Sequence, residues 1–336
     1  MFAWEFSFWK LRHLRRCFPE LVVKDCKHPS YVPLGETLAV WGMKEVPHDY
    51  LKRVSLIRVE DGFLRSVGLG ADLAMPLSWV IDRRGMHYDC SKPSDLELML
   101  LQTNFSEQLL ERANSLRKHI VEMGVTKYNL QGNMWVRRLD TFNVILVAGQ
   151  VESDASITFG SVGFQTNLNL LKKVRQDNPL SYIVYKPHPD VLSGMRRKGV
   201  KEEDASLWCD EIVGDVCTSS LLSQVDEVHV MTSQLGFEGL LRGKKVVCYG
   251  LPFYAGWGLT HDRFFIERRT RRLNIDELVA CALILYPIYM SKDGKSLISP
   301  EEALKELSSL KKSQIAFPVV LKEIYRCLLR LWIGVR

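Results

Sequence analysis

The chain has 336 residues, of which 46% are hydrophobic and 25% are charged, and it carries a formal net charge of +6. This length and composition predict a globular protein of about two domains and exclude a disordered or fibrous chain. The basic residues are spread along the sequence without an arginine-rich arm, a zinc-finger spacing or an RNA-binding aromatic motif, so we expect no nucleic-acid partner and favour an anionic small substrate or an anionic membrane surface.

The cysteines and the apolar runs indicate the compartment. No two of the eight cysteines form a CxxC pair, and none clusters with histidine at a metal-ligand spacing, which is typical of reduced thiols in a cytoplasmic protein. No apolar run approaches the ~18–20 residues of a membrane span. The aromatic, partly charged start of the sequence does not resemble a signal peptide. We therefore expect a cytoplasmic protein that is soluble or lies peripherally on the inner membrane.

Residues 1–135 predict one α/β unit. The segment 1–30 is aromatic and basic, and it predicts a helix that packs on this unit or lies on a protein or lipid surface. Three apolar runs followed by polar turns predict strands at 38–43, 54–59 and 77–82. Ser94 and Glu97 have the spacing of a capping box, so we expect a long helical segment to begin there. The result is a Rossmann-like N-terminal domain on the acceptor side.

The second unit opens with an almost uninterrupted apolar run over residues 143–148, which is typical of a strand buried on both faces of a parallel sheet. Further apolar runs, alternating with helical segments, predict strands at 181–185, 211–213, 227–231 and 244–249. This alternation predicts a doubly wound sheet in a Rossmann-like donor domain over residues 141–275, after a polar linker at 127–140. Residues 276–336 are predicted to form C-terminal helices.

Polar residues gather where these strands end, in clusters at 60–66, 150–154, 186–190 and 232–238. Open α/β sheets bind ligands beyond the carboxyl ends of their strands. Neither unit contains a GxGxxG fingerprint or a P-loop lysine motif, which argues against a nicotinamide enzyme or a P-loop kinase. Two Rossmann-like domains with a cleft between them, followed by helices, correspond to a glycosyltransferase-B-like α/β fold.

Four segments resemble, in this order, the motifs of the capsule polysaccharide biosynthesis family, which includes the KpsC-type β-Kdo transferases: Glu60–Ser66, Gln150–Ser156, Lys186–Pro189 and Gly250–Thr260. The resemblance spans roughly residues 36–290. It implies a cytoplasmic, membrane-associated enzyme of capsule or lipopolysaccharide biosynthesis. Such an enzyme takes Kdo from CMP-β-Kdo and retains the β configuration in the product. KpsC-type proteins commonly carry two such modules, and this sequence is long enough for one.

The donor-side residues are expected to stabilise the leaving nucleotide. CMP leaves with extra negative charge, which Lys186 and His188 can stabilise without a divalent metal, and the resemblance implies the same role for this His-Pro motif. We therefore expect no metal or other cofactor. Ser233 and Gln234 precede a predicted helix whose first-turn amides suit a phosphate or a carboxylate, and the fold type implies a ribose contact for Glu238. Four further residues are predicted on the donor side: Gln150, Glu152, Gly250 and Tyr254, the last of which is equally compatible with the core.

The catalytic carboxylates are expected on opposite domains. Retention by two inversions requires a carboxylate nucleophile, and we predict Asp154 for this role, with Glu152 as the alternative. The family pattern has an acidic residue where this chain has Ser153, but the following aspartate is kept. Glu60 or Asp61 is predicted to accept the proton of the acceptor hydroxyl.

The acceptor, a glycolipid or an oligosaccharide, is expected on the first domain. Arg65 is predicted to pair with the neighbouring acids or with the carboxylate of Kdo, and Asp82 and Tyr88 are weaker acceptor contacts. Two other functions remain open: transfer of another CMP-sugar such as a sialic acid, and a non-catalytic scaffold of capsule assembly. Residues 310–336 carry six basic residues and one acid among apolar ones, which predicts a helix that binds anionic membrane or packs back on the first domain.

Overall fold

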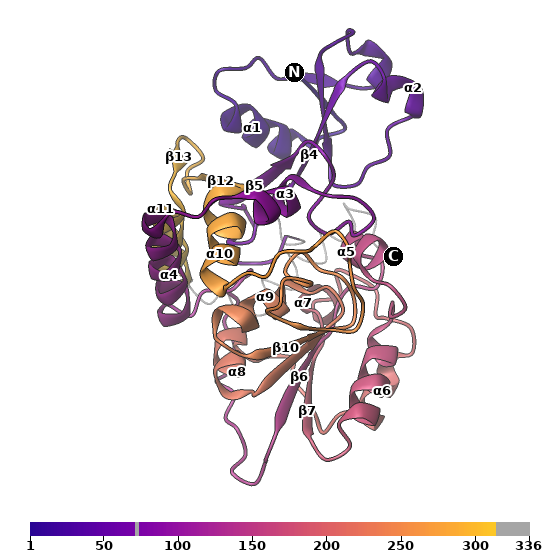
Figure 1. The fold of residues 1–336 in the computed structure, drawn as a ribbon, viewed down its shortest axis with the longest axis vertical. Coiled ribbons are helices and arrows are strands. Elements are labelled where there is room, and N and C mark those ends of the chain that lie inside the picture. The colour runs from indigo at the N-terminus through magenta and orange to yellow at the C-terminus, as the bar shows by residue number, and fades with distance from the viewer. Residues whose placement is uncertain (71–73, 314–336) are drawn as a thin grey trace.

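The computed structural model describes residues 1–70 and 74–313. Two α/β units lie one above the other along the long axis, and the chain returns to the first unit after it completes the second (Figure 1). The predicted two-unit α/β architecture is confirmed.

The first unit is built on a seven-stranded sheet in the order β13-β12-β5-β4-β3-β1-β2. Its strands are β1 (Phe2–Trp4), β2 (Lys24–Cys26), β3 (Thr37–Trp41), β4 (Ser55–Asp61), β5 (Ser78–Asp82), β12 (Pro287–Met290) and β13 (Leu297–Ile298). The pairs among β1 to β4 are parallel, whereas β5 pairs antiparallel with β4 and β12. The sheet is therefore mixed rather than purely parallel, because a parallel return needs a long crossover and the described part of the β4–β5 connection contains no helix.

The helices of the first unit are α1 (Phe8–Cys17), α2 (His48–Leu51), α3 (Asp95–Gln102) and α4 (Glu107–Glu122), with a short 3-10 turn at Pro29–Tyr31. Ser94 caps α3 by accepting a hydrogen bond from the Glu97 amide at 3.1 Å. Glu97 does not complete the predicted capping box. Its carboxylate instead pairs with Arg268 and, at 3.0 Å, with Arg269 from the second unit. This buried ion pair fastens the two units together.

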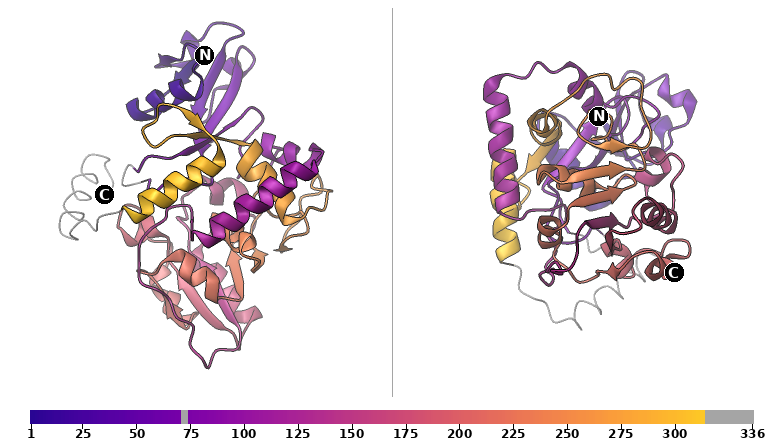
Figure 2. Two further views of the ribbon diagram at one scale, coloured as in Figure 1. Left: turned by 90° about the vertical axis from the view of Figure 1, so that its left-hand side faces the viewer. Right: turned by 60° about the horizontal axis from the view of Figure 1, so that its bottom comes forward.

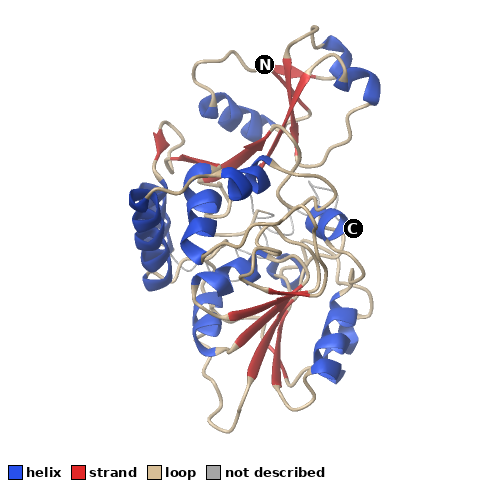
Figure 3. Ribbon diagram, viewed as in Figure 1, coloured by secondary structure: helices blue, strands red, loops and turns tan. Residues whose placement is uncertain are grey.

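The second unit has a six-stranded sheet in the order β11-β10-β9-β6-β7-β8, and every pair in it is parallel. Its strands are β6 (Val144–Ala148), β7 (Tyr182–Lys186), β8 (Glu211–Ile212), β9 (Glu227–Val230), β10 (Lys245–Cys248) and β11 (His261–Asp262). Its helices are α5 (Ala155–Gly160), α6 (Asn167–Asp177), α7 (Pro189–Leu192), α8 (Thr218–Gln224) and α9 (Gln234–Leu241), with a 3-10 helix at Glu202–Leu207. Helices cover both sides of the sheet (Figure 3). The strand order reverses between β6 and β9, so the ends of these two strands form the switch point at which doubly wound sheets bind ligands.

The C-terminal segment combines α10 (Ile275–Val279), a π-helical stretch (Ala280–Leu285), strands β12 and β13, and α11 (Pro300–Lys312). The two strands join the first sheet. The prediction that this segment is purely helical is therefore wrong for residues 287–298. Helices α4 and α11 lie side by side (Figure 2), joined by a bidentate pair between Arg112 and Glu301 at 2.7 and 3.0 Å. The chain thus crosses back and covers the first unit.

Aromatic packing holds the loop after β4 against the second unit. Phe63 lies 4.5 Å from Phe253 and 6.1 Å from Phe237, measured between ring centroids. Gln234 adds a hydrogen bond from its side-chain amide to the Phe63 carbonyl at 2.7 Å. These contacts hold the loop after β4 against the second unit, so the carboxyl end of β4 faces the strand ends of the second sheet.

Candidate active site

Two carboxylates from different units form the centre of the candidate site. Glu60 is the penultimate residue of strand β4, and Asp154 caps the N-terminus of α5, beyond the end of β6. Asp154 is exposed, and one of its oxygens accepts the Ser156 amide at 2.8 Å. Burial, together with the negative charges of Asp61 and Asp154, raises the pKa of Glu60 to about 7. The two predicted catalytic carboxylates are therefore close enough for their charges to interact.

Tyr88 lies against the inner carboxylate. Its hydroxyl is 3.4 Å from Oε2 of Glu60, and burial raises the pKa of the phenol. Gly42 faces both groups with a φ of +54°, and a Cβ added to it would lie 3.0 Å from each. The glycine therefore gives Glu60 and Tyr88 room, in a backbone conformation that other residues rarely adopt.

Asp61 does not share the position of Glu60. Its Oδ2 accepts a hydrogen bond from Nε of Arg65 at 2.6 Å, and this guanidinium is almost fully buried. The other oxygen, Oδ1, is buried and accepts no hydrogen bond from the described residues. Of the two pairings predicted for Arg65, the structure therefore shows the internal ion pair. Glu60 is the better candidate for a proton acceptor.

His188 contributes a neutral ring with a defined tautomer. It caps the short helix α7, and its Nδ1 accepts the Asp190 amide at 3.1 Å. Burial, together with the positive charge of Lys127, lowers the pKa of His188 to about 4. The ring is therefore neutral at pH 7 with its proton on Nε2, because Nδ1 is the acceptor. The free N–H suits the donation to phosphate that we predict for this residue.

Lys186 is engaged elsewhere. It is the last residue of β7, and its ammonium donates to the Val216 carbonyl at 3.0 Å. Burial lowers its pKa. In this structure Lys186 holds the segment before α8, so the predicted phosphate contact would require this hydrogen bond to be shared.

Gln150 and Glu152 are structural rather than donor-binding, which corrects two predictions. The side-chain amide of Gln150 donates to the Thr232 hydroxyl at 3.0 Å, and its oxygen accepts the Thr232 amide at 2.9 Å. These two hydrogen bonds connect the end of β6 to the end of β9 at the switch point. The Glu152 oxygens accept the amides of Asn167 and Val200, both at 2.8 Å. Because both of its oxygens already accept backbone amides, Glu152 is the weaker candidate for the nucleophile.

The start of α9 makes contacts within the protein as well. The Ser233 hydroxyl caps the helix by accepting the Leu235 amide at 3.2 Å. The Gln234 side chain binds the first unit, as described above. Glu238 is buried and accepts the Lys127 amide at 2.7 Å, and burial raises the pKa of its carboxyl group. Glu238 thus fixes the linker, in place of the ribose contact that we predict.

The glycine-rich segment after β10 is tightly packed. A Cβ on Gly250 would lie 2.9 Å from the Met231 carbonyl oxygen and 2.9 Å from Cγ2 of Thr232, so this glycine serves strand packing. Tyr254 is fully buried, and its hydroxyl donates to the Ser233 carbonyl. The core alternative for Tyr254 is therefore the one observed, and the predicted donor contacts at 250 and 254 are wrong for this structure.

Asp82 is also a structural residue. It is fully buried at the end of β5, and its oxygens accept hydrogen bonds from four donors: the amides of Arg84, Gly85 and Asp95 and the Tyr286 hydroxyl. No acceptor capacity is left for a substrate. The prediction of Asp82 as an acceptor contact is therefore wrong, whereas Tyr88 lies at the centre of the site.

Lys127 and Tyr128 belong to the site and are not predicted from the sequence. Both lie in the segment that we interpret as a linker. The charge of Asp154 acts on both side chains, and the ring of Tyr128 lies edge-on to His188 at 6.2 Å. In the sequence, these residues are only a basic and an aromatic residue side by side between two domains. That pattern does not predict a site residue unless the fold is known.

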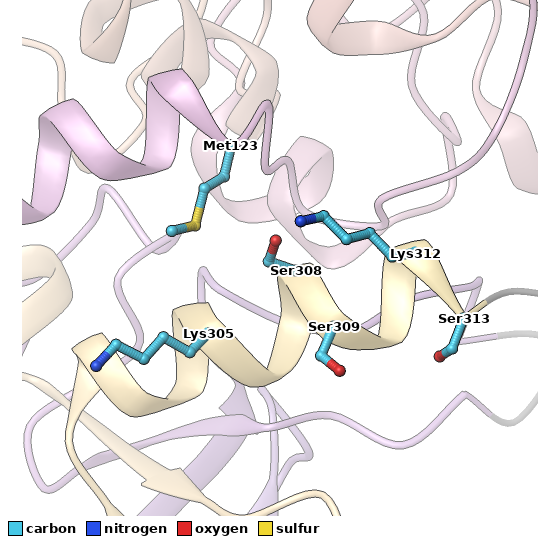
Figure 4. A pocket seen from close by; sticks show the side chains of 6 residues that line it. All are labelled: Met123, Lys305, Ser308, Ser309, Lys312 and Ser313. Atoms are coloured by element: carbon cyan, nitrogen blue, oxygen red, sulfur yellow. The ribbon is translucent and has the colours of Figure 1, made fainter.

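One hollow on the surface lies away from these residues. It has a volume of about 530 Å³ and lies between the end of α4 and the last turns of α11, lined by Met123, Lys305, Ser308, Ser309, Lys312 and Ser313 (Figure 4). A second cavity of only about 10 Å³ lies between the two units, behind Lys127 and Glu238. Within residues 1–70 and 74–313, no three His, Cys, Asp or Glu side chains are grouped to hold a metal. None of the described helices has the length and apolarity needed to cross a bilayer.

The sequence matches one protein family over most of its length. The profile of the family described as capsule polysaccharide biosynthesis protein matches residues 36–139 and 133–291. The capsule polysaccharide modification protein LipA of Neisseria meningitidis serogroup B is 46% identical over 261 residues, which make up 78% of this chain and 37% of LipA. The lipopolysaccharide-processing protein LpsZ of Rhizobium meliloti is 41% identical over 281 residues, or 81% of this chain and 64% of LpsZ. The chain thus spans about a third of LipA and less than two thirds of LpsZ.

Two solved structures are similar over nearly the whole chain, and both are described as Thermosulfurimonas dismutans KpsC. The β-Kdo 2,7 transferase superimposes with a TM-score of 0.76 and 40% identity, covering 93% of this chain and 99% of that structure. The β-Kdo 2,4 transferase superimposes with a TM-score of 0.79 and 33% identity, covering 92% and 98%.

Proposed function

This chain belongs to the capsule polysaccharide biosynthesis family and has a glycosyltransferase-B-like fold, and from that premise we propose that it is a Kdo transferase that takes Kdo from CMP-β-Kdo with retention of configuration. The acceptor is a glycolipid or a saccharide. The observation that carries the proposal is the pair of carboxylates, Glu60 and Asp154, which come from different units and whose charges interact. The likeness to two Kdo transferases supports Kdo as the transferred sugar.

The first step uses the exposed carboxylate. An oxygen of Asp154 attacks the anomeric carbon of Kdo while the bond from that carbon to the phosphate oxygen breaks, and CMP leaves with the bonding electrons. The neutral ring of His188 donates its Nε2–H to the departing phosphate, since Nδ1 is occupied by the Asp190 amide. The product is a glycosyl ester of Asp154 with inverted configuration.

The second step uses the partly buried carboxylate, Glu60. The acceptor hydroxyl attacks the same carbon, its proton passes to Glu60, and the Asp154 carboxylate leaves, which restores the original configuration. Because the charge of Asp154 raises the pKa of Glu60, esterification of Asp154 removes that charge and lowers this pKa. Glu60 is therefore ionised in a larger fraction of molecules at the stage where the reaction needs a base.

CMP release tests the donor and the activity together. We expect CMP to form from CMP-Kdo and to form faster with a short Kdo-containing lipid acceptor, whose product is then identified by mass spectrometry and NMR. Faster release from CMP-sialic acid would instead support a transferase of another CMP-sugar. No release from either donor, with or without acceptor, would contradict an enzymatic role and favour a scaffold.

Catalysis is expected to proceed without a divalent metal and to depend on His188. Full activity in excess EDTA is the expected result, and His188→Ala is expected to lower kcat by ~10²-fold because a donor to the leaving phosphate is lost. Steady-state rates of CMP release measure both effects. His188→Gln, which keeps an N–H donor, serves as the matched variant and should recover part of the rate. A strict requirement for Mg²⁺, or a wild-type rate in His188→Ala, would contradict this account.

We further propose that the end of the chain associates with anionic membrane. From Gln314 onward this segment lies outside the described residues, but α11, which precedes it, is fixed by its own contacts: its N-terminus has a capping box, and Lys311 donates to the Gly124 carbonyl at 2.7 Å. A chain stopped after Gln314 should therefore fold. Each basic residue near an anionic surface adds ~1 kcal/mol, so we expect salt-sensitive pelleting with anionic vesicles that the shortened chain loses.

Neutral vesicles and activity on a soluble acceptor are the controls for this comparison. The membrane role predicts that the shortened chain keeps its melting temperature and its soluble activity. If it unfolds, or pellets as well as the full chain, the segment packs on the protein instead.

A further inference from the structure

Helix α1 packs on the first sheet with one face and leaves the opposite face exposed. Its inner side chains Leu11, Leu14 and Cys17 are buried in one cluster with Val59 of β4. The structure therefore shows the packing that the segment 1–30 predicts, but only for the inner face of the helix. The helix lies at the outside of the first unit (Figure 1), so the residues of its outer face are available to a partner.

Large apolar side chains lie exposed at both ends of this outer face. Phe8, in the first turn of α1, is 82% exposed. Beyond the other end, Leu21 and Val22 are 51% and 75% exposed. They lie beside the last turn of the helix, because Nε of Arg15 donates a hydrogen bond to the Val23 carbonyl at 3.1 Å. The two apolar sites are therefore separated by about 10 Å, the rise of seven helical residues.

Exposed cations lie among these apolar side chains. Arg12 and Arg15 follow Phe8 at spacings of four and seven residues, so the three side chains lie along one side of the helix. Val23 is buried, so Lys24 after it is directed outward, as it would be in an extended segment, and it is exposed. None of these three cations has a carboxylate within 4.0 Å among the described residues. Residues 8–25 contain five lysines and arginines against two acids, Glu20 and Asp25.

We propose that this surface, formed by Phe8, Arg12, Arg15, Leu21 and Val22, is a contact site for anionic membrane. Exposed apolar side chains together with cations that lack a carboxylate match the acyl boundary and the anionic headgroups of a lipid leaflet. A protein bound through the same cations would meet isolated apolar side chains instead of the continuous apolar centre of a typical interface. The inference rests on the proposed membrane association of the end of the chain, because one contact of this size is marginal and stable association takes two.

The surface belongs to the unit on which we expect the acceptor. Lys10 of the same helix is directed toward the sheet, with Nζ 3.2 Å from the ring centroid of Trp41 at the end of β3. Trp41 pairs in register with Val59, the residue before Glu60. Helix α1 therefore lies between the proposed membrane surface and the end of β4. A lipid-linked acceptor would reach the protein on the unit that holds the proposed base.

Pelleting of the full chain with vesicles of phosphatidylcholine and phosphatidylglycerol tests this surface. The parent protein is compared with the double variant Phe8→Ser, Val22→Ser and with Arg12→Gln. We expect the double variant to lower the vesicle partition coefficient about tenfold or more, because two apolar side chains no longer leave water. Arg12→Gln should lower it about fivefold, the effect of one cation near an anionic surface. Pure phosphatidylcholine vesicles should bind all three proteins weakly.

Phe142→Ser and Lys118→Gln are the matched controls, because both side chains are exposed on other parts of the molecule. Each should pellet like the parent, and every variant should keep its melting temperature and its transfer to a soluble acceptor. If the double variant pellets like the parent, or if only Arg12→Gln weakens binding, the surface does not insert and the proposal is wrong. If the parent does not pellet with anionic vesicles, the membrane association fails as a whole, and this surface with it. A lack of CMP release in the parent is a different outcome, which concerns the proposed activity.

Discussion

Asp154→Asn is expected to abolish Kdo transfer and to leave CMP binding within about twofold of wild type. Asparagine keeps the size and the side-chain oxygen that caps α5 through the Ser156 amide at 2.8 Å, but it cannot form the glycosyl ester. Because the covalent route loses its nucleophile, the residual rate should lie at least ~10³-fold below wild type. CMP release from CMP-Kdo with acceptor, followed by chromatography, measures the loss.

Glu152→Gln is the matched control, because Glu152 is the neighbouring acid whose oxygens accept two backbone amides. It should reduce stability and retain transfer. Substantial activity in Asp154→Asn, together with its loss in Glu152→Gln, would exchange the roles of these two residues.

Glu60→Gln is expected to slow transfer by about 10²–10⁴-fold, the usual contribution of a general base. The loss should fall on the second step, because Glu60 takes the proton of the acceptor and has no part in the departure of CMP. Rapid quenching should therefore show one equivalent of CMP released quickly, followed by a slow steady rate. Equal slowing of the first release would contradict this division of roles.

The pH dependence gives an independent measure of the same residue. Burial raises the pKa of Glu60 to about 7 in the free enzyme, and the base is active when it has lost its proton. The rate of the second step should therefore rise with pH, with a midpoint below this value because the ester of Asp154 carries no charge. The positive charge of Lys10 lowers the pKa of Glu60, so Lys10→Met should raise this pKa and move the acidic limb to higher pH. A profile of kcat/KM for the acceptor against pH that is the same in both proteins would contradict the assignment.

Strand ends were predictable because they depend on local pattern. The apolar run 143–148 is typical of a buried strand, and polar residues at the carboxyl end of such a strand lie near the edge of a parallel sheet, which is where Asp154 is found. The same reasoning predicts Glu60 and His188 directly after their strands; His188 does follow β7, whereas β4 extends to Asp61 and includes Glu60. The mixed pairing of the first sheet depends instead on how β5, β12 and β13 return from distant parts of the chain, and no local pattern carries that information.

The errors at the site have a common physical origin. Gln150, Gln234 and Glu238 are polar residues at strand or helix ends, which predicts ligand contacts, but each side chain bonds to another part of the chain 82 to 171 residues away. Such bonds are decided by the packing of the two units. Lys127 was missed for the converse reason: its segment has the composition of a linker, and it becomes part of the site only because both units hold its backbone.

The most direct test of the double displacement is the mass of the intact protein during turnover. The Glu60→Gln variant should accumulate the intermediate, since its second step is slowed, so incubation with CMP-Kdo and immediate acid quenching should add the mass of one Kdo residue. Peptide mapping should locate that mass on Asp154, and Asp154→Asn in the same background should show none. Steady transfer by wild type with no adduct in Glu60→Gln, or an adduct that persists after Asp154→Asn, would contradict the mechanism.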